Sequence, residues 1–570
     1  MGRRSTHGGF SIHQHLQHLH HHHSESFDSL FTSMSLQEKS QSVDHVEQNE
    51  KEWSHTQGKE GADIDRNMSL REAIKAYPGA IAWSFFLSSS IIMEGYDIVL
   101  IGNLMAQPAF QKAYGDWYGE KLGYQISGPW QSGLGNATAV GTIIGAFANG
   151  WLTQRFGYRR TLVASLIAVT GFIFITFFAH NLPMLLAGSL LCGLPWGVFA
   201  TMAPAYASEI CPMALRGYLA NYVCLCWALG QLLAAGVLFS FSGGTTQWSY
   251  RIPFAIQWVW PIPLILILWF TPESPYWLAK HNRLDEAKNV LRRISAKSSK
   301  TDEDLDKQLA MIVHTNKIES EHTQGSSYLD CFKGINLRRT EIVSFVFVAQ
   351  NTTGVGIGGT PTYFFVQAGV DPRNSFKFAT GALGLASVGV ILSWFLIYRI
   401  GRRALYVWSC AACTLLMLLI GILASLPQTQ AVSFGQAAIV LVWEVVFYAT
   451  IGPVCYAIIG EIPAVGVRSK SICIARIAYY ISQILNGTYG PYMINPTEGD
   501  WKGKVGYFWA GLSLLTFIWA YFRLPETKGR TFEEIDILFA NKTSARHFAD
   551  TKVDAYADDS EGRIIKDTDV

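Results

Sequence analysis

The chain has 570 residues, of which 49% are hydrophobic and only 15% are charged. Soluble domains usually carry about 25% charged residues, so this composition excludes an ordinary soluble protein and indicates a membrane protein. The formal net charge of +2 is too small to indicate an acidic or basic partner, and we expect no nucleic acid among the partners.

The N-terminal segment, residues 1–75, is polar and of low complexity, and it contains a His-rich tract from His13 to His23. Such a tract can bind metal, but the simpler interpretation is a disordered cytoplasmic tail, and no metal site is predicted. The segment also lacks the apolar core of a cleavable signal peptide. Targeting is therefore expected to depend on the first membrane helix.

Beyond this tail the charges cluster and leave twelve apolar stretches of about 20 residues. Each stretch is long enough to cross the hydrocarbon core as an α-helix, so the lipid bilayer is an expected partner. The stretches cover approximately residues 80–106, 132–152, 161–179, 184–208, 218–240, 252–271, 341–366, 378–398, 404–425, 435–459, 470–490 and 505–522. The sequence therefore predicts an all-α membrane protein with twelve transmembrane helices.

The positions of basic residues predict the orientation in the membrane. Arg155 and Arg160 lie between the second and third stretches, and Arg399 and Arg403 lie between the eighth and ninth. The connection 272–340 is also rich in Lys and Arg, whereas the connections after the third and ninth stretches contain neither. Because loops rich in Lys and Arg stay in the cytoplasm, both termini and the connection 272–340 are expected there.

These boundaries divide the chain into five expected regions. They are an N-terminal cytoplasmic tail (1–75), an N-terminal six-helix bundle (76–271), a cytoplasmic linker with short helices (272–340), a C-terminal six-helix bundle (341–522) and a C-terminal cytoplasmic tail (523–570). The last region is charged, and we expect it to be disordered beyond Phe539. The two tails offer surface to signalling or trafficking partners.

Three charged phrases occur once in each half of the chain, at offsets of 244, 252 and 253 residues. The pairs are Arg155 to Arg160 with Arg399 to Arg403, Glu209 and Arg216 with Glu461 and Arg468, and Pro272-Glu273-Ser274 with Pro525-Glu526-Thr527. Offsets this regular indicate that one six-helix unit is used twice, which gives two pseudo-symmetric six-helix bundles. Such a repeat is typical of transporters that rock two halves around a central site.

The repeated charges predict a cytoplasmic gate. The expected pairs are Arg155 and Arg160 with Glu209 and Glu273, and Arg399 and Arg403 with Glu461 and Glu526, while Arg216 and Arg468 complete the two sets. Such pairs would hold the outward-facing state and break when the inner gate opens. Each pair is weak when solvated, so the pairs would bias an equilibrium rather than lock it. The alternative is that the arginines only set the topology.

Charges inside the membrane predict where protons are handled. Glu94 and Asp97 are three residues apart on one face of the first helix. A charged carboxylate at mid-bilayer costs roughly 2.5–3.5 kcal/mol even on the lenient insertion scale. A group that gains and loses a proton as its exposure alternates is what proton coupling requires. The alternative for both residues is a structural acid that is held by its neighbours.

Arg476 in the eleventh stretch is the expected counter-charge of these acids. Arg476, Tyr479, Tyr480 and Gln483 fall at helical spacing and form one polar stripe on an otherwise apolar helix. Such a stripe should face a central cavity rather than lipid. The alternative is an interfacial arginine whose side chain reaches the headgroups.

At its charged phrases the chain resembles the sugar porter family of the major facilitator superfamily. The motifs that carry the resemblance occur in the family's order across residues 80–540. They are Gly95-Tyr96-Asp97, Arg155-x-Gly157, Pro204-x-Tyr206-x-x-Glu209, Pro272-Glu273-Ser274-Pro275 and Pro525-Glu526-Thr527-Lys528-Gly529. Strings such as Cys192-Gly193-Leu194-Pro195-Trp196-Gly197 and Pro491-Tyr492-Met493-Ile494-Asn495-Pro496-Thr497 are similar to the fungal maltose or α-glucoside permease branch. The resemblance implies an acid used for proton coupling at Asp97 and a role for Arg476 like that in α-glucoside permeases.

The resemblance also implies a sugar site. Sugars need amides for pairs of hydroxyls and aromatic faces for their C–H surface. The predicted substrate-binding residues are Gln231, Gln350, Asn351, Tyr363, Tyr456, Tyr479 and Trp196. A buried amide that only joins two helices is the alternative for each polar residue. Gly354, Gly356, Gly358 and Gly359 would let the seventh helix break and close over the substrate, or would only allow close helix packing.

Four positions on the presumed pathway depart from what the resemblance implies: Cys224, Thr142, Tyr448 and Tyr480. Related permeases tend to carry Gln or Asn, an acid, Asp and Asn at these positions, respectively. The departures favour a different disaccharide, such as a β-linked one, or weaker coupling to protons.

We expect a plasma-membrane transporter that takes up a disaccharide or oligosaccharide, with an α-glucoside such as maltose as the first candidate, by proton symport. The alternatives are a transporter-like receptor that senses a disaccharide with little flux, and a passive facilitator. No nucleophile–base pair or metal constellation is visible in the sequence. Hence we predict no enzyme activity, no catalytic residue and no cofactor.

Overall fold

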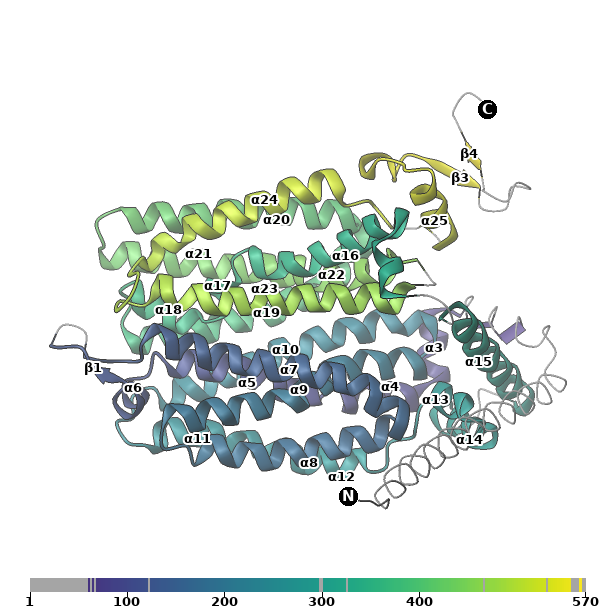
Figure 1. Ribbon diagram of the computed structural model, residues 1–570, viewed down its shortest axis with the longest axis horizontal. Coiled ribbons are helices and arrows are strands. Elements are labelled where there is room, and N and C mark those ends of the chain that lie inside the picture. The colour runs from purple at the N-terminus through teal and green to yellow at the C-terminus, as the bar shows by residue number, and fades with distance from the viewer. Residues whose placement is uncertain are drawn as a thin grey trace, which may run out of the picture.

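The computed structural model describes residues 60–61, 64–65, 68–120, 123–296, 301–323, 327–464, 467–528, 530, 532–554 and 563–565. The His-rich tract and most of the N-terminal tail that the sequence singles out lie outside the described residues. Figure 1 shows the chain as two adjacent helical bundles, with the purple and blue N-terminal bundle below the green and yellow C-terminal one.

The N-terminal bundle consists of long helices and of two spans that are interrupted. Its elements are α4 (Pro78–Ser88), α5 (Ser90–Leu104), α7 (Gly128–Phe156), α8 (Tyr158–Phe177), α9 (Leu182–Ile210), α10 (Met213–Phe241), α11 (Trp248–Ile256), η1 (Gln257–Val259) and α12 (Pro261–Leu268). The first span is α4 followed by α5, and the sixth is α11, η1 and α12 in sequence. Six spans result, as the sequence predicts.

The C-terminal bundle repeats this order with its own interruptions. Its elements are α16 (Gly334–Thr352), α17 (Val355–Gly358), α18 (Pro361–Gln367), α19 (Pro372–Ile400), α20 (Arg402–Ser425), α21 (Gln430–Ala449), α22 (Ile451–Glu461), α23 (Arg468–Ile494) and α24 (Val505–Arg523). The seventh span comprises α16 to α18, and the tenth comprises α21 and α22. The two bundles meet along two helix pairs, α10 against α19 and α7 against α23.

Within the described residues, nine helices are long and apolar enough to cross a membrane by length and composition. The three remaining expected spans are α7, the broken segment α16 to α18, and α23. These three carry more polar residues and glycine because one side of each lines the central cavity, where a helix need not be apolar. The outer surface, by contrast, exposes large apolar side chains such as Trp408, Trp151 and Phe395. An apolar exterior around polar interior helices is the arrangement that a bilayer requires.

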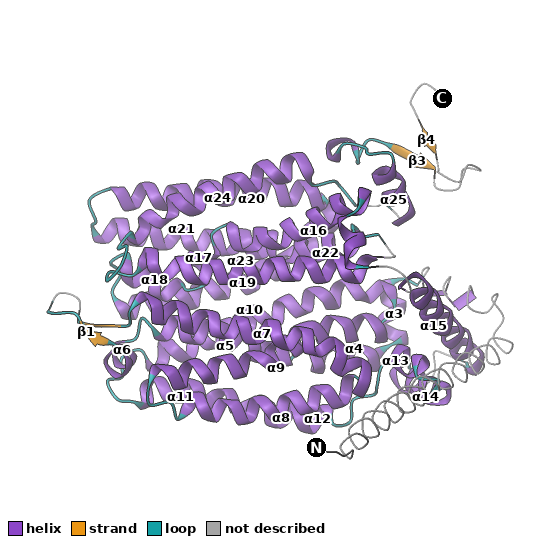
Figure 2. Ribbon diagram, in the orientation of Figure 1, coloured by secondary structure: helices purple, strands orange, loops and turns teal. Residues whose placement is uncertain are grey.

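The two ends of the bundles differ in what covers them, as Figure 2 shows. At the end that we call the hairpin end, α6 (Pro108–Tyr114) precedes a small antiparallel pair, β1 (Asp116–Trp117) with β2 (Tyr124–Gln125). At the opposite end, which we call the motif end, lie the repeated charged phrases. That end also carries α3 (Leu70–Ala76), α13 (Pro275–Lys280), α14 (Leu284–Ile294), α15 (Asp302–Thr323), η2 (Tyr328–Phe332) and α25 (Phe532–Ala540).

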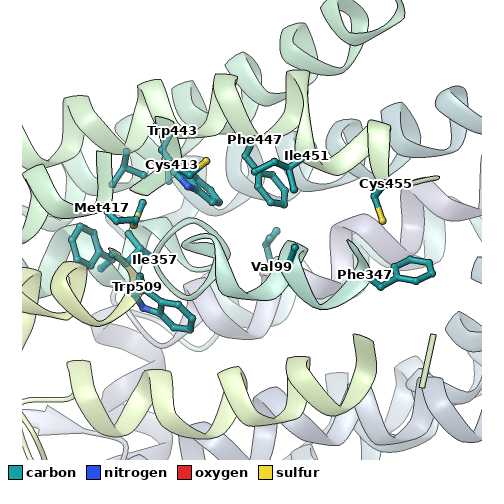
Figure 3. Packing of buried hydrophobic residues seen from close by; sticks show 14 of the residues in the cluster. Val99, Phe347, Ile357, Cys413, Met417, Trp443, Phe447, Ile451, Cys455 and Trp509 are labelled. Carbon is teal, nitrogen blue, oxygen red and sulfur yellow. The ribbon is translucent and has the colours of Figure 1, made fainter. Parts of the chain in front are cut away.

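The seventh span breaks where glycine is required. Gly354 has a φ of +112°, a conformation that favours glycine, and it separates α16 from α17. A Cβ on Gly358 would lie only 2.0 Å from the ring of Trp443 on α21. Helix α17 packs against α21, and Figure 3 shows Trp443 of α21 beside Cys413 and Phe447 beside Ile451. The break therefore lets α21 approach the short helix closely, so close packing accounts for at least part of the glycine pattern.

The C-terminal tail corrects the sequence-based prediction. Disorder beyond Phe539 was expected, but residues 541–554 are described and packed. Phe548 is fully buried and its ring lies 5.1 Å from that of Phe539. Arg338 at the start of α16 donates a 3.0 Å hydrogen bond to the carbonyl of Thr543 and lies over the Phe539 ring. Because the tail is rich in charged residues, its composition did not indicate that Phe539 and Phe548 are buried.

Candidate functional site

A cavity of about 350 Å³ lies between the two bundles. This volume falls within the usual range of small-molecule sites, roughly 300–1,000 Å³. All ten residues that the sequence predicts for proton coupling or substrate binding line it: Glu94, Asp97, Trp196, Gln231, Gln350, Asn351, Tyr363, Tyr456, Arg476 and Tyr479. Positions more than 350 residues apart in the chain thus contribute to a single enclosed surface.

Asp97 is held by two donors from other helices of its own bundle. One carboxylate oxygen accepts a 2.8 Å hydrogen bond from Nε2 of Gln257 on η1, and the other accepts a 3.0 Å bond from Nε1 of Trp196 on α9. Asp97 is only 7% exposed. Trp196 is fully buried, so in this conformation its ring holds the carboxylate and offers no open face for stacking, which differs from the role predicted for it.

Glu94 lies one turn before Asp97 on the same face of α5. One of its carboxylate oxygens, Oε2, is buried and has no hydrogen-bond partner among the described residues. Arg476 on α23, across the bundle boundary, acts electrostatically on Glu94. The hydrogen-bond partners of Asp97, by contrast, are Gln257 and Trp196 of its own bundle. The structure therefore places the predicted counter-charge opposite Glu94 rather than opposite Asp97.

Arg476 itself sits in a cage of aromatic rings rather than in a salt bridge. Its guanidinium carbon lies 4.8 Å from the ring centre of Phe347 and between 5.7 and 5.9 Å from three tyrosine rings. These tyrosines are Tyr456, Tyr479 and Tyr480. A cation within about 6 Å of an aromatic face is stabilised by it, more strongly when water is excluded. The cage lets a positive charge remain in the membrane interior without neutralising Glu94 directly.

The predicted amides of the sugar site already have partners. Oε1 of Gln231 on α10 accepts a 2.9 Å hydrogen bond from the hydroxyl of Tyr448 on α21, which joins the two bundles. Gln350 on α16 donates to the carbonyl of Gly452 at 3.2 Å. Both amides line the cavity as well, so each combines an interhelical bond with access to whatever occupies the space.

Asn351 and Tyr363 also bridge elements around the cavity. The Asn351 amide donates to the carbonyl of Tyr479 at 3.1 Å and to the hydroxyl of Ser482 at 2.8 Å, which ties α16 to α23. The hydroxyl of Tyr363 accepts a 3.3 Å bond from Gln131 of the other bundle. Asn351 therefore acts in this conformation mainly as a helix-to-helix link.

Hydrogen bonds between the bundles also occur toward the hairpin end of the cavity. Asn136 on α7 donates to the hydroxyl of Thr488 on α23 at 2.8 Å, and Ser132 donates to the carbonyl of the same residue at 3.0 Å. Together with the bond between Gln131 and Tyr363, these contacts bridge the two bundles at that end. They have to break for the cavity to open there.

At the motif end of the N-terminal bundle, two carboxylates organise the start of α8. Glu273 accepts hydrogen bonds from the backbone N–H of Tyr158 at 2.7 Å and of Arg159 at 3.2 Å. Glu209 accepts a 2.5 Å bond from the hydroxyl of Tyr158 and another from the hydroxyl of Ser274. Burial raises the pKa of the Glu273 carboxyl, although these backbone donors act in the opposite direction. Glu273 thus serves as an N-cap for α8 supplied from outside the helix.

The C-terminal bundle repeats this arrangement residue by residue. Glu526 accepts hydrogen bonds from the backbone N–H of Arg402 at 2.9 Å and of Arg403 at 3.0 Å, at the start of α20. Glu461 accepts a 2.8 Å bond from the guanidinium of Arg402 and a 2.5 Å bond from the hydroxyl of Thr527. On the donor side, Arg402 stands where the first bundle has Tyr158, and Thr527 stands where it has Ser274. The backbone N–H of Lys528 also donates to Glu526 at 3.1 Å, where the first bundle has Pro275.

Capping replaces most of the arginine pairs that the sequence predicts. Among the described residues, no ion pair joins Arg155, Arg160 or Arg399 to the four carboxylates. Arg403 donates instead to the carbonyls of Leu524 and Tyr521, each at 2.9 Å. The ion pair that does form uses Arg402, which was not among the predicted gate residues.

The last two residues of the predicted gate also find other partners. Nε of Arg216 donates to the carbonyl of Cys211 at 3.2 Å. Arg468 lies within electrostatic range of Asp536 on α25. The four predicted carboxylates therefore lie at the motif end with partners other than those predicted, because the sequence could not show that helix starts face them.

Glycine precedes both capped helices for a physical reason. Gly157 and Gly401 have φ values of +84° and +101°, which side chains with a Cβ rarely adopt. A Cβ on Gly157 would lie 2.5 Å from Oε2 of Glu273, and one on Gly401 would lie 2.8 Å from Oε2 of Glu526. Only glycine lets each carboxylate approach the backbone donors.

Two residues of the site were not predicted from the sequence. They are Gln257, which holds Asp97 without lining the cavity, and Glu444 on α21, which lines the cavity with a fully buried carboxyl. Tyr448, which the sequence indicates only as a departure from related permeases, holds Gln231. Glu444 could have been found, because an ionisable residue within an apolar stretch is a functional candidate by default. The partners of Asp97 and Gln231 depend on the arrangement of the helices and leave no local signal. Among the described residues, no group of three or more His, Cys, Asp or Glu side chains is placed to hold a metal ion.

Comparisons with known proteins agree with this geometry. The family model for sugar (and other) transporters matches residues 83–539. The general α-glucoside permease of Saccharomyces cerevisiae is 37% identical over 498 residues, covering 86% of this chain and 80% of the permease. The maltose permease MAL31 of the same yeast is 38% identical over 503 residues, covering 88% and 82%.

Solved structures with the same fold include a sugar symporter. The proton:xylose symporter XylE bound to 6-bromo-6-deoxy-D-glucose has a TM-score of 0.65 at 18% identity, covering 81% of this chain and 99% of XylE. An inward-open form of XylE from E. coli has a TM-score of 0.64 at 20% identity, covering 80% and 99%. At these identities the likeness establishes the fold alone. With the two bundles, the shared cavity and the yeast relatives, the chain belongs to the sugar transporter family and has the major facilitator fold, as a multi-pass membrane protein that is a transporter and not an enzyme.

Proposed function

We propose that this protein takes up a disaccharide or other oligosaccharide across the plasma membrane by proton symport, with an α-glucoside such as maltose as the preferred cargo. The observation that carries the proposal is that Glu94 and Asp97 of α5 line one cavity with the caged cation Arg476, which acts on Glu94, among amides and aromatic rings. The names of the yeast relatives support the choice of cargo.

Protons would enter the cycle through α5. Asp97 is held by neutral donors only, so a proton added to it would break one of these hydrogen bonds and loosen α5 from η1 or α9. Such a change of contacts within one bundle is what links protonation to rocking of that bundle. Glu94 would respond to the same movement because its distance from Arg476 depends on how the bundles are placed.

The motif end would face the cytoplasm, together with both termini. The support is the arginine-rich character of its connections, which the positive-inside rule places on the cytoplasmic side. The capped starts of α8 and α20 would then form the inner end of the transport path. The hydrogen bonds between Asn136 and Thr488 would belong to the outer end.

The test is uptake of labelled maltose by cells that lack their own sugar transporters, with external pH recorded during the assay. Proton symport requires accumulation above the external concentration together with alkalinisation of the medium. Equilibration of maltose without accumulation would show a passive facilitator and overturn the coupling. The same assay with cellobiose separates an α-linked from a β-linked cargo.

A second candidate is a transporter-like sugar receptor with little flux. One observation favours it: the Tyr448 hydroxyl occupies the carbonyl oxygen of Gln231 and ties the two bundles together at the cavity. A receptor must bind the sugar and change its conformation, but it does not have to complete a transport cycle. It would be supported if cells expressing this protein showed no maltose flux but retained a sugar-induced transcriptional response.

A further inference from the structure

Glu444 is a buried carboxyl in the wall of the cavity that the mechanism above does not use. It lies on α21 beside Trp443, Phe447 and Tyr448, and these four residues form the face of that helix that lines the cavity. The side chain is only 1% exposed, and neither of its carboxyl oxygens has a hydrogen-bond partner among the described residues. Native proteins rarely leave such groups unsatisfied without a functional reason.

The surroundings of Glu444 contain no cation to balance a charge. The helices packed against α21 are α17 to α20 and α22. Of these, α17, α18 and α22 carry no Lys or Arg, and the cations of α19 and α20 lie near the helix ends, at Arg373, Lys377, Arg399, Arg402 and Arg403. The Tyr448 hydroxyl, one turn away on the same helix, lies within electrostatic range of Glu444. A neutral carboxyl, which both donates and accepts hydrogen bonds, is the form that such surroundings favour.

The position of this carboxyl is fixed by its neighbours. Nε1 of Trp443 donates a 2.7 Å hydrogen bond to the carbonyl of Thr353, directly before the break at Gly354. One turn beyond Glu444, the Tyr448 hydroxyl bonds Gln231 on the opposite wall. The rings of Trp443 and Phe447 stack with their centres 4.9 Å apart, and their helix, α21, packs against α17. The unsatisfied carboxyl is therefore held at a constant place between the helix break and the predicted sugar amide.

We propose that Glu444 is the hydrogen-bonding group of the C-terminal wall that receives a hydroxyl of the bound sugar. This inference rests on the proposed function, because it requires that a sugar enters the cavity. A ligand covered with hydroxyls supplies the donor and the acceptor that the protein does not, and Glu444 lines the same cavity as Tyr448. The site would then reject a sugar that lacks this hydroxyl, since the carboxyl would stay unpaired.

The test is maltose binding to the purified full-length protein, followed by intrinsic tryptophan fluorescence. Glu444→Gln keeps a donor and an acceptor, whereas Glu444→Met keeps only the volume. We expect Glu444→Met to raise the half-saturating concentration roughly tenfold and Glu444→Gln to change it by about threefold or less. Gln436→Met is the matched control, because Gln436 is a buried polar residue on the same helix that does not line the cavity.

A panel of maltose analogues, each lacking one hydroxyl, identifies the group that Glu444 contacts. The wild type should bind the analogue that lacks the contacted hydroxyl more weakly than it binds maltose. Glu444→Met should bind this analogue and maltose with equal affinity. If Glu444→Met does not fold, the infrared difference spectrum upon maltose addition carries the test. Maltose should shift the absorption band of a protonated carboxyl in this spectrum, and the shift should be absent in Glu444→Gln.

The outcomes separate this inference from the proposed function. Unchanged maltose affinity in Glu444→Met, or an infrared band that does not respond to maltose, overturns the inference alone. Loss of pH-driven accumulation in Glu444→Gln with normal maltose counterflow also overturns it, because the residue would then carry protons. If the wild type binds neither maltose nor cellobiose, both the inference and the proposed cargo fail.

Discussion

The motif end and the central cavity of this transporter differ in whether the two bundles contribute matching residues. At the motif end the two bundles match residue by residue, with Glu273 and Glu526 capping α8 and α20 at comparable distances. In the cavity they do not match, because the acids Glu94 and Asp97 come from α5 whereas the cation comes from α23. The duplicated part carries the predicted gate, and the unmatched part carries the residues on which the proposed cargo binding and proton coupling depend.

The largest expected effect comes from removing the acid on which coupling is proposed to depend. One proton moving through 100 mV is worth about 2.3 kcal/mol, which corresponds to a concentration ratio of about 50. Asp97→Asn should therefore reduce maltose accumulation from such a ratio to about one, while maltose counterflow continues. The measurement is uptake of labelled maltose in transporter-null cells.

Trp196→Phe is the matched control for Asp97→Asn. It removes one of the two donors to the carboxylate and leaves the acid in place, so accumulation should fall only in part. Full concentrative uptake by Asp97→Asn would show that coupling depends on another group.

The second largest effect should appear at the glycines before the capped helices. Gly157→Ala combines a strained φ with a Cβ that would lie 2.5 Å from the Glu273 carboxylate. A loss of roughly 1–3 kcal/mol is expected, measured as a lower unfolding temperature of the purified protein. Gly150→Ala is the control, because a Cβ there meets nothing within 4 Å. Equal behaviour of the two variants would mean that the close approach to Glu273 is not needed.

These glycines also show how much of the structure could be predicted from the sequence. The repeat offsets predict two bundles of six helices, and they place Glu209, Glu273, Glu461 and Glu526 at one end of the molecule. Identical residue types in both halves indicate a shared role but cannot distinguish a charge pair from a helix cap. That distinction depends on the turn at each glycine, which becomes visible only with φ and the direction of the N–H groups.

The cavity shows the complementary limit. Polar residues within apolar stretches predict which side chains face the interior, and all ten of the predicted residues line one space. Their contacts are set by helices that lie far apart in sequence. The bond from Trp196 to Asp97 spans 99 residues, and the bond from Tyr448 to Gln231 spans 217. A pattern within one helix contains no information about such pairs.

The third prediction tests whether the two caps are equivalent. Glu273→Gln and Glu526→Gln each keep the size of the side chain but remove the negative charge that faces the backbone N–H groups. Each should reduce stability by about 1 kcal/mol, the usual scale of an N-cap or a charge at a helix start. The measurement is again the unfolding temperature. If only one of the two variants lost stability, the two caps would have the same geometry but would contribute differently to the free energy of unfolding.

The smallest effect is expected where the two motif networks differ chemically. Arg402→Tyr gives the C-terminal network the tyrosine that the first bundle has at Tyr158, and the hydroxyl can still donate to Glu461 as Tyr158 does to Glu209. The ion pair that is lost is partly solvated, with side chains 21% and 25% exposed, and pairs of this kind contribute about 0.2–1 kcal/mol. Maltose uptake should therefore stay within about twofold of the wild type.

Arg402→Ala separates the hydrogen bond to Glu461 from the charge. It removes both and should lower the unfolding temperature more than Arg402→Tyr does. If Arg402→Tyr abolished uptake while the protein remained folded, the positive charge itself would be needed in the second bundle. The two motif networks would then have the same geometry but different roles, because the first bundle has the neutral Tyr158 at the same position.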